Sequence, residues 1–239
     1  MIAMNASVRL DGIASPEVAG QFLASLGIQA AEIRVPSRFE RIAGHTADHL
    51  LLVLISMVLA LAAALPLGVL AAHRRQAGGI ILGVVGAIYT IPALALLVFM
   101  IPLMGIGAAP AIVALFLYSL LPIVRNTHAG LVGIPASLRE SAEALGLSPL
   151  TILRRVELPL ASPAIMAGVK TAVVINIGTA TLGALIGAGG LGQPILTGIR
   201  LADTGLILEG AVPAALLALL AQAAFDGLER WIVPEGLRL

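Results

Sequence analysis

Cysteine is absent from the 239-residue chain, and charged and aromatic residues are scarce. Without cysteine, disulfide bonds, thiolate metal sites and cysteine nucleophiles are excluded. Only 11% of the residues are charged, whereas about 25% is usual in soluble domains, so an ordinary water-soluble globular protein is excluded as well. The net charge is +1 and only 3% of the residues are aromatic, without the basic, aromatic-containing patch that binds nucleic acid. We therefore expect no nucleic-acid partner.

Long apolar stretches dominate the chain instead, with 59% hydrophobic residues and a mean hydropathy of +1.04. A membrane-spanning helix needs about 20 mostly apolar residues, because the backbone must satisfy its own hydrogen bonds in hydrocarbon. The uncharged run 76–124 is too long for one span, and we expect it to fold back at 102–110, where prolines and glycines cluster. The sequence predicts an all-α integral membrane protein with five spans, near 50–72, 79–101, 109–127, 163–186 and 204–225.

Prolines occur inside four of the five predicted spans, at Pro66, Pro92, Pro122 and Pro213. Each removes a backbone donor and is expected to bend its helix. Membrane helices tolerate proline, but bends in this many spans favour a bundle that changes conformation.

Residues 1–46 contain no apolar run long enough to span a membrane, and they lack the pattern of a secretory signal peptide. We interpret them as an extracytoplasmic or interfacial tail, with a short helix near 16–28. An odd number of spans puts the two termini on opposite sides. If the N-terminus is outside, most arginines between the spans fall in the cytoplasm, as the positive-inside rule favours, and residues 231–239 form a cytoplasmic tail.

A polar segment between the third and fourth predicted spans contains the pattern of a short helix on the cytoplasmic side. Ser137 followed by Glu140 is the pattern of a capping box, and Gly146 is placed to end the helix in a left-handed conformation. An apolar stripe along this helix offers a contact surface to a protein partner or to the rest of the bundle. The stripe consists of Leu138, Ala142 and Leu145.

A second short helix is predicted to follow directly. Ser148 would be its N-cap, with Pro149 in the first turn. The helix is expected to stop before Pro159, because proline cannot continue the hydrogen-bond pattern of a helix interior. Each of the two helices is about ten residues long, which is too short to cross a membrane.

This polar segment resembles the EAA loop of binding-protein-dependent ABC transporter permeases. The motif reads Glu140-Ser141-Ala142, then Gly146 after three residues, and Val156-Glu157-Leu158-Pro159 after nine more. Ser141 and Val156 stand where alanine and isoleucine are usual, and both are conservative departures. The resemblance covers about 47–230 and is strongest to osmoprotectant permeases, importers of glycine betaine, choline or carnitine. The segments that carry this likeness are 89–97, 114–127 and 177–192.

The resemblance implies a type I ABC importer permease in the bacterial cytoplasmic (inner) membrane. The transmembrane domain would cover 47–230, with cytoplasmic coupling helices over about 137–158. Two permease subunits, either copies or paralogues, would form the pore, and a binding protein would deliver solute from outside. ABC ATPase subunits would push the coupling helices and so switch the bundle between two conformations. The residues carried over as ATPase contacts are Glu140, Ser141, Ala142, Gly146, Val156, Leu158 and Pro159.

ATP hydrolysis is expected on a separate subunit, because the sequence contains no G-x-x-x-x-G-K-[ST] phosphate-binding motif. We expect no enzymatic activity, no catalytic residue and no bound metal or cofactor in this chain, with ATP and Mg²⁺ held by the partner. A small set of polar residues within the spans could line a pore, although a hydrogen bond between helices is the plainer explanation for each. The candidates are Tyr89, Thr90, Asn126, Asn176, Thr179, Thr181 and Glu209, the last of which could instead lie at the outer interface.

Other interpretations fit the sequence less well. Residues 187–192 match G-x-G-x-x-G, but no strand precedes them, so a tight turn is preferred to a dinucleotide site. His45, Asp48 and His49 lie near one another in sequence, but no further metal ligand is close. Within the family, the alternative is a permease for methionine or another small solute. Outside it, the alternatives are a self-contained channel or ion-coupled carrier, disfavoured by the uncharged spans, and a membrane enzyme, disfavoured by the lack of a clustered catalytic set.

Overall fold

The computed structural model describes residues 15–26 and 36–232. The chain divides into two compact units, Met1–Arg41 and Ile42–Leu239, which are described separately. The described part of the first unit contains α2 (Ser15–Ser25), which confirms the predicted short helix, and the start of α3 (Arg38–His73). Helix α3 continues through residue 46, so the boundary expected there between the tail and the transmembrane domain falls inside a helix.

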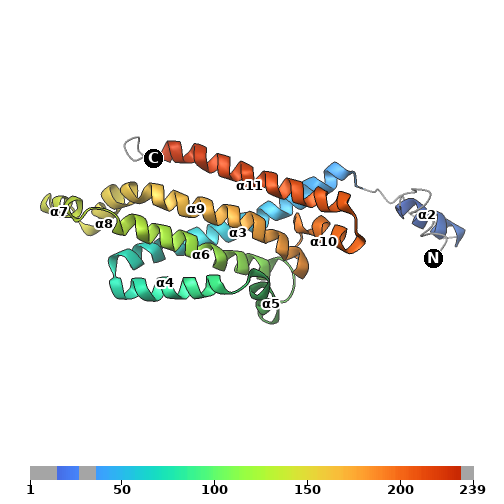
Figure 1. The fold of residues 1–239 in the computed structure, drawn as a ribbon, viewed down its shortest axis with the longest axis horizontal. Coiled ribbons are helices and arrows are strands. Elements are labelled where there is room, and N and C mark those ends of the chain that lie inside the picture. Colours follow the sequence, from blue (N-terminus) through green and yellow to red (C-terminus); the bar gives the residue numbers. More distant parts are fainter. Residues whose placement is uncertain (1–14, 27–35, 233–239) are drawn as a thin grey trace. The chain divides into compact units, whose positions relative to one another are not determined.

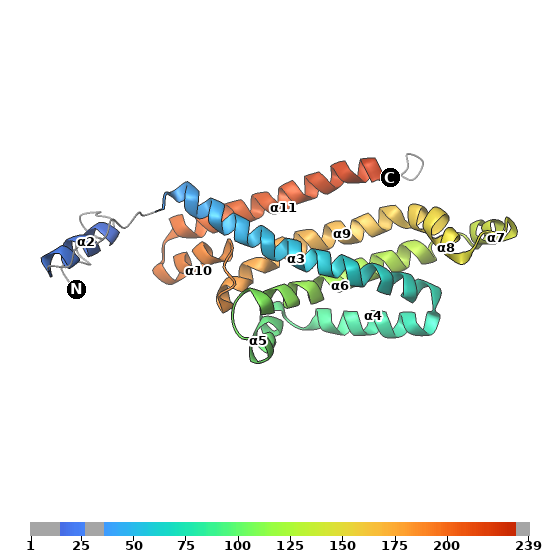
Figure 2. The ribbon, with the colours of Figure 1, turned by 180° about the vertical axis from the view of Figure 1, so that it is seen from behind.

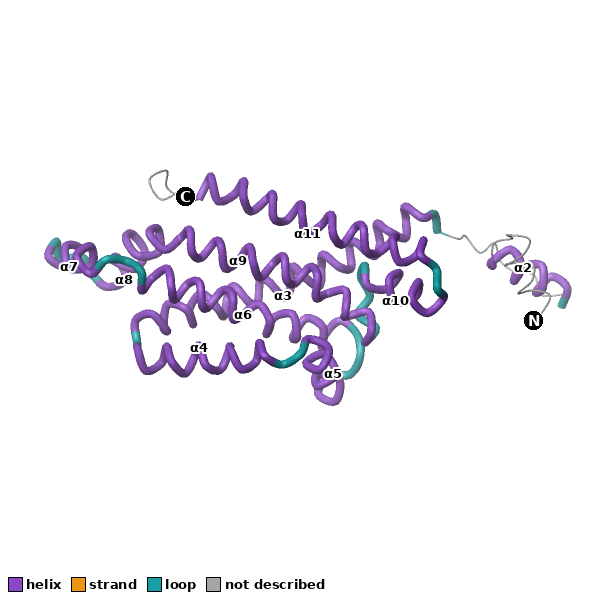
Figure 3. The backbone as a smooth tube through the Cα atoms, viewed as in Figure 1, coloured by secondary structure: helices purple, strands orange, loops and turns teal. Residues whose placement is uncertain are grey.

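The second unit is a bundle of helices, and no strand occurs in residues 36–232 (Figures 1 and 3). The predicted all-α class is confirmed for the part of the chain that the structure describes. Helices α7 and α8 lie at one end of the bundle, while α5 and α10 lie at the other (Figure 1). After α3, the elements are α4 (Arg75–Thr90), α5 (Ala93–Met104), α6 (Ala108–Val132), α7 (Ala136–Ala144), α8 (Pro149–Ile152), the π-helical segment η1 (Leu153–Glu157), α9 (Leu158–Ala180), the 3₁₀ segment η2 (Thr181–Ile186), α10 (Gly192–Leu201) and α11 (Thr204–Ile232).

Four helical segments are long and apolar enough to cross a membrane, and a bent pair makes a fifth if it counts as one span. The four segments are Arg38–His73, Ala108–Val132, Pro149–Ile186 and Thr204–Glu229. The bent pair is α4 with α5, whose axes differ by 97°. The structure therefore accommodates the five predicted spans, and the bend predicted at Pro92 is a complete break between two helices.

The break in that helix lies at Ile91 and Pro92. A residue before proline is pushed towards extended backbone, and Ile91 has φ −68° and ψ 127°. Tyr118 of α6 donates a hydrogen bond from its hydroxyl to the carbonyl of Ile91, so the carbonyl freed by the break has a partner. The chain then turns between α5 and α6 at Gly105 and Gly107, both with positive φ, within the predicted segment 102–110.

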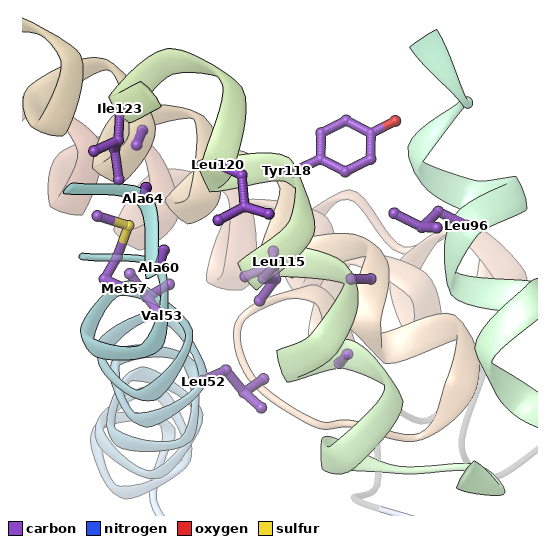
Figure 4. Packing of buried hydrophobic residues seen from close by; sticks show 14 of the residues in the cluster. Leu52, Val53, Met57, Ala60, Ala64, Leu96, Leu115, Tyr118, Leu120 and Ile123 are labelled. Atoms are coloured by element: carbon purple, nitrogen blue, oxygen red, sulfur yellow. The ribbon is translucent and has the colours of Figure 1, made fainter. Parts of the chain in front are cut away.

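The core of the bundle lies between α3, α5 and α6 and extends to α9 (Figure 4). Leu52, Met57 and Ala60 of α3 face Leu115 and neighbouring side chains of α6 in this core. Helix α3 crosses α6 and α9 on the side seen in Figure 2. Most of the core is therefore built by helices that are far apart in the sequence.

Two glycines let these helices approach closely. A Cβ atom on Gly68 of α3 would lie 2.6 Å from Cβ of Thr127 in α6. A Cβ on Gly168 of α9 would lie 2.7 Å from both Cβ of Asn126 and the carbonyl oxygen of Pro122 in α6. Small residues at such contacts are the usual means by which membrane helices pack without a hydrophobic driving force between them.

Candidate functional site

The segment with the EAA-like motif forms a helical hairpin at one end of the bundle (Figure 1). Helix α7 ends with Gly146 at φ +74°, whose N–H donates to the carbonyl of Glu143 at 2.8 Å. The N–H of Leu147 donates to the carbonyl of Ala142 at 3.3 Å. This pattern of a left-handed residue with two backward bonds is a common helix ending. The predicted role of Gly146 in ending the helix is confirmed.

The predicted capping box at Ser137 is wrong. The N-cap of α7 is Pro135, with φ −54° and ψ 135°, and no side chain caps the helix. Ser137 lies inside α7, where its carbonyl accepts a hydrogen bond from the Ser141 hydroxyl at 2.7 Å. Proline fixes φ before the first helical residue, so the helix begins earlier than the serine. A capping box does occur before α3, where Ser37 N donates to Glu40 Oε2 at 2.7 Å and Glu40 N donates to Ser37 Oγ at 3.2 Å.

The second short helix begins as predicted and ends differently. Ser148 is the N-cap of α8, its hydroxyl accepts from Thr151 N at 3.4 Å, and a proline follows it in the first turn. The helix does not stop before Pro159. It continues through η1, where Leu158 N–H bonds to the carbonyl of Leu153, five residues back, and Pro159 then sits in the first turn of α9. A π-helical turn inserts one extra residue, and proline is tolerated in the first turn of a helix.

This continuity joins the hairpin to the bundle. Residues Pro149–Ile186 form a single apolar helical segment, so the second arm of the hairpin is the extended end of a membrane-spanning helix. No loop therefore separates the hairpin from α9.

The residues carried over as ATPase contacts differ in exposure. Exposed side chains are Glu140, Ser141 and Pro159, together with the Gly146 backbone, whereas Val156 and Leu158 are half-buried and Ala142 is buried. The apolar stripe is divided accordingly, because Ala142 faces the protein itself while Leu138 is 44% exposed and Leu145 is 79% exposed. Leu150 of α8 adds a third exposed leucine, at 54%. These three leucines are large apolar side chains that the hairpin exposes.

Sequence reasoning missed Glu157, a buried carboxylate of the hairpin that contacts two basic side chains. Its side chain is 3% exposed, and its two oxygens contact Arg139 Nε at 2.6 Å and His73 Nε2 at 3.0 Å. Arg139 belongs to α7 and His73 ends α3. The available signal was an acidic residue beside apolar ones, two residues before a proline, since an unpaired buried carboxylate would be costly.

The pore candidates fall into separate places. Tyr89 stacks against Tyr118 with ring centroids 5.3 Å apart, beside the break between α4 and α5. Thr179 and Tyr118 both line a small internal cavity. The hydroxyl of Thr90 donates to the carbonyl of Ala87 at 2.7 Å, so it is satisfied within its own helix.

Two further candidates are satisfied locally in the same way. Thr181 Oγ1 donates to the carbonyl of Gly178 at 2.7 Å. Asn126 Nδ2 donates to the carbonyl of Pro122 at 2.7 Å. The structure therefore does not bring the seven candidates into one polar lining.

Asn176 and Glu209 are both inside the protein. Asn176 is fully buried and its Nδ2 donates to Ser56 Oγ of α3 at 3.1 Å, while its Oδ1 has no partner among the described residues. Glu209 is 6% exposed, so it is covered by protein and is not a freely exposed interfacial carboxylate. Asn176 makes the kind of bond between helices that the sequence suggested as the plainer explanation.

The glycine-rich turn 187–192 packs against α3. Gly187, Gly189 and Gly190 have positive φ, and a Cβ on Gly190 would lie 3.1 Å from Nδ1 of His49. His49 is fully buried, and its Nε2 lies 2.9 Å from the carbonyl oxygen of Ile177. Among the described residues, no group of three His, Cys, Asp or Glu could hold a metal ion. The contact of His49 with Ile177 joins α3 to α9, and the turn follows a 3₁₀ segment rather than a strand.

Comparison with known proteins identifies the family. Residues 64–235 match the model of the binding-protein-dependent transport system inner membrane component. The chain is 45% identical to the choline transport system permease protein OpuBB of Bacillus subtilis, over 81% of this chain and 89% of the relative. It is 43% identical to the osmoprotectant import permease protein OsmW of Salmonella typhimurium, over 82% and 94%.

A solved structure agrees with this assignment. The structure of the MetNI methionine ABC transporter in inward-facing conformations matches with a TM-score of 0.74 and 26% identity, over 81% of this chain and 97% of that one. The expected type I ABC importer permease fold is confirmed. The chain belongs to the family of binding-protein-dependent transport system inner membrane components, the multi-pass permease subunits of ABC importers.

Proposed function

We propose that this chain is the permease subunit of an ATP-driven importer for a small osmoprotectant such as glycine betaine, choline or carnitine. The observation that carries the proposal is the similarity to curated permeases named for choline, carnitine, glycine betaine or osmoprotectant transport, at 41–45% identity over about four fifths of the chain. The similarity to the methionine transporter is lower, at 26% identity. Methionine is therefore the solute to test as the alternative within the family.

The hairpin is the proposed contact for the ATPase. Its exposed leucines, Leu138, Leu145 and Leu150, offer apolar surface at the tip, and burial of apolar area stabilises protein association. The continuous segment Pro149–Ile186 would carry the displacement into the bundle. ATP and Mg²⁺ would be held and hydrolysed by the partner subunit, and this chain would supply no catalytic residue.

The remaining partners follow from the same proposal. A second copy of this chain or a paralogous permease completes the pore, and a binding protein docks at the end of the bundle opposite the hairpin. The hairpin and the C-terminus lie in the cytoplasm and the N-terminus lies outside, in the bacterial inner membrane. Because the chain has no cysteine, a single Glu143→Cys variant would report this orientation, by reacting with a membrane-impermeant thiol reagent only from the cytoplasmic side.

The proposal is tested by uptake into proteoliposomes that contain this permease with its ATPase and binding protein. The expected result is ATP-dependent uptake of labelled glycine betaine, choline or carnitine, with little uptake of methionine. ATP-dependent uptake of methionine alone would reassign the solute within the family. Uptake that proceeds without ATP would favour the alternative that the protein is a self-contained channel or an ion-coupled carrier.

A further inference from the structure

Helix α7 is held to the rest of the protein by few side chains. Of its nine residues, Ala136–Ala144, all are exposed except Arg139, which is half-buried, and Ala142, which is buried. If α7 is to move other helices, it must be firmly attached to them. An exposed helix held only by two flexible connections would move without displacing its neighbours. The polar contacts of Arg139 are therefore central to how α7 is connected.

Arg139 makes two contacts to different parts of the bundle. Its Nε lies 2.6 Å from Oε1 of Glu157, at the end of η1. Its Nη2 donates to the carbonyl of Leu131 at 2.5 Å, in the last turn of α6. One guanidinium thus connects α7 to the ends of two longer helical segments, through an ion pair with Glu157 and a hydrogen bond to the Leu131 backbone.

The same carboxylate also reaches α3. Oε2 of Glu157 lies 3.0 Å from Nε2 of His73, the last residue of α3. Nδ1 of His73 lies 2.9 Å from the carbonyl oxygen of Val69 in its own helix. Both ring nitrogens of His73 therefore lie within hydrogen-bond distance of an oxygen, one in Glu157 and one in the backbone of α3.

The cluster of Glu157, Arg139 and His73 thus joins three elements around one carboxylate that is 3% exposed. The two basic side chains are 34% and 44% exposed, but the carboxylate between them is buried and would lose compensation of its charge if it moved away from them. A cleft of about 370 Å³ lies beside it, lined by these three residues and by the carboxylate-bearing Glu143. The covalent path from α7 to α3 runs through α6, α5 and α4, so the cluster is a much shorter mechanical route between them.

We propose that Glu157 is a positioning residue that couples the hairpin to α3, so that displacement of α7 by the ATPase moves the end of α3 together with α7 and α9. This inference rests on the proposed function, because it requires an ATPase that pushes the hairpin. Glu157 touches neither solute nor nucleotide; it acts through Arg139 and His73.

The first test compares Glu157→Gln with Glu229→Gln in the complete transporter, reconstituted with its ATPase and binding protein. Glu157→Gln keeps the size of the side chain and removes its charge. The expected result is normal assembly with the ATPase and continued ATP hydrolysis, with solute transported per ATP hydrolysed reduced about fivefold. Glu229→Gln is the control, because Glu229 is a half-buried carboxylate of α11, outside the hairpin, and it should transport normally. An unchanged ratio in Glu157→Gln would overturn the proposal.

The second test measures the connection itself. The chain has no cysteine, so spin labels can be attached at Glu143→Cys in α7 and Arg74→Cys just after α3. In the otherwise unmodified transporter, the distribution of distances between the labels should show one narrow peak with and without ATP. In Glu157→Gln, this peak should broaden or shift on ATP binding. Equal distance distributions in the two proteins under both conditions would overturn the proposal. If the unmodified transporter shows no ATP-driven uptake, the proposed function itself fails. If the unmodified transporter is active and Glu157→Gln behaves in the same way, the coupling role alone fails.

Discussion

Nδ2 of Asn176 donates a hydrogen bond to Oγ of Ser56 across 3.1 Å, and the two residues are 120 positions apart in the sequence. Both side chains are fully buried between α3 and α9. Hydrogen bonds of this kind between membrane helices contribute about 0.6 kcal/mol on average and up to about 2 kcal/mol. The pair therefore holds two helices together at a place where polar side chains could otherwise have suggested a pore.

We predict that Ser56→Ala lowers the free energy of unfolding in detergent by about 1 kcal/mol, because it leaves the buried amide of Asn176 without its partner. The measurement is thermal or denaturant unfolding of the purified protein. Thr171→Val is the control, since the exposed Thr171 hydroxyl bonds only to Ala167 of its own helix. Loss of transport without any loss of stability would show that the pair lines the solute path instead.

Gly168→Val should destabilise the protein by about 1–3 kcal/mol, the usual cost of overpacking. A Cβ at this position would meet Asn126 and the Pro122 carbonyl at 2.7 Å, so α9 must move away from α6. Gly178→Val, in the same helix, is the matched control, because a Cβ there has no heavy atom within 4 Å. Equal stability of the two variants would contradict the close contact between α6 and α9.

Tyr118→Phe is predicted to destabilise the break between α4 and α5 by about 1 kcal/mol, because the Ile91 carbonyl loses its hydrogen bond. Tyr89→Phe should have a smaller effect, since the contact of Tyr89 with Tyr118 is a ring contact. Hydrogen exchange near Ile91 measures the local opening directly. The idea fails if the amides around residue 91 exchange at the same rate in both variants.

Gly146→Val should impair the hairpin, because a β-branched residue is strained at φ +74° by about 1–2 kcal/mol. Gly146→Asn should be tolerated better, since asparagine adopts left-handed backbone more readily. ATP-driven uptake and ATPase co-purification are the measurements. If both substitutions behave alike, the backbone conformation is not what makes the glycine necessary.

Much of the fold follows from the sequence because its signals are local. Apolar length places the spans, Gly146 ends α7, and Ser148 with Pro149 begins α8. A bend at Pro92 was predicted within the span near 79–101, but hydropathy does not show whether a proline bends a helix or breaks it completely. In the structure, Tyr118 satisfies the carbonyl freed at Ile91, and that partner comes from another helix.

The candidate site was harder to predict for the same physical reason. Pro159 reads as a helix end, but the π-helical turn before it lets the helix continue into α9. The helix begins after Pro135, so Ser137 lies inside it and does not cap it. The pairing of Glu157 with His73 joins residues 84 positions apart, so no local pattern could have revealed it.

The exposed leucines of the hairpin provide a direct prediction about the ATPase. Leu145→Asp, at a side chain that is 79% exposed, should weaken retention of the ATPase during purification, because a charge replaces apolar contact area. Leu201→Asp, at a side chain that is 65% exposed in α10, is the control at the opposite end of the bundle. Equal retention in both variants would place the ATPase contact elsewhere.

The most direct measurement is gentle extraction of the tagged protein from its native membrane, followed by mass spectrometry of everything that co-purifies in stoichiometric amount. We expect a nucleotide-binding ATPase in that set, together with a second copy of this permease or a paralogue. We also expect ATP-dependent uptake when the complex is placed in vesicles with its binding protein. A protein that is extracted alone and still moves solute without ATP would contradict its assignment as the pore of an ATP-driven importer.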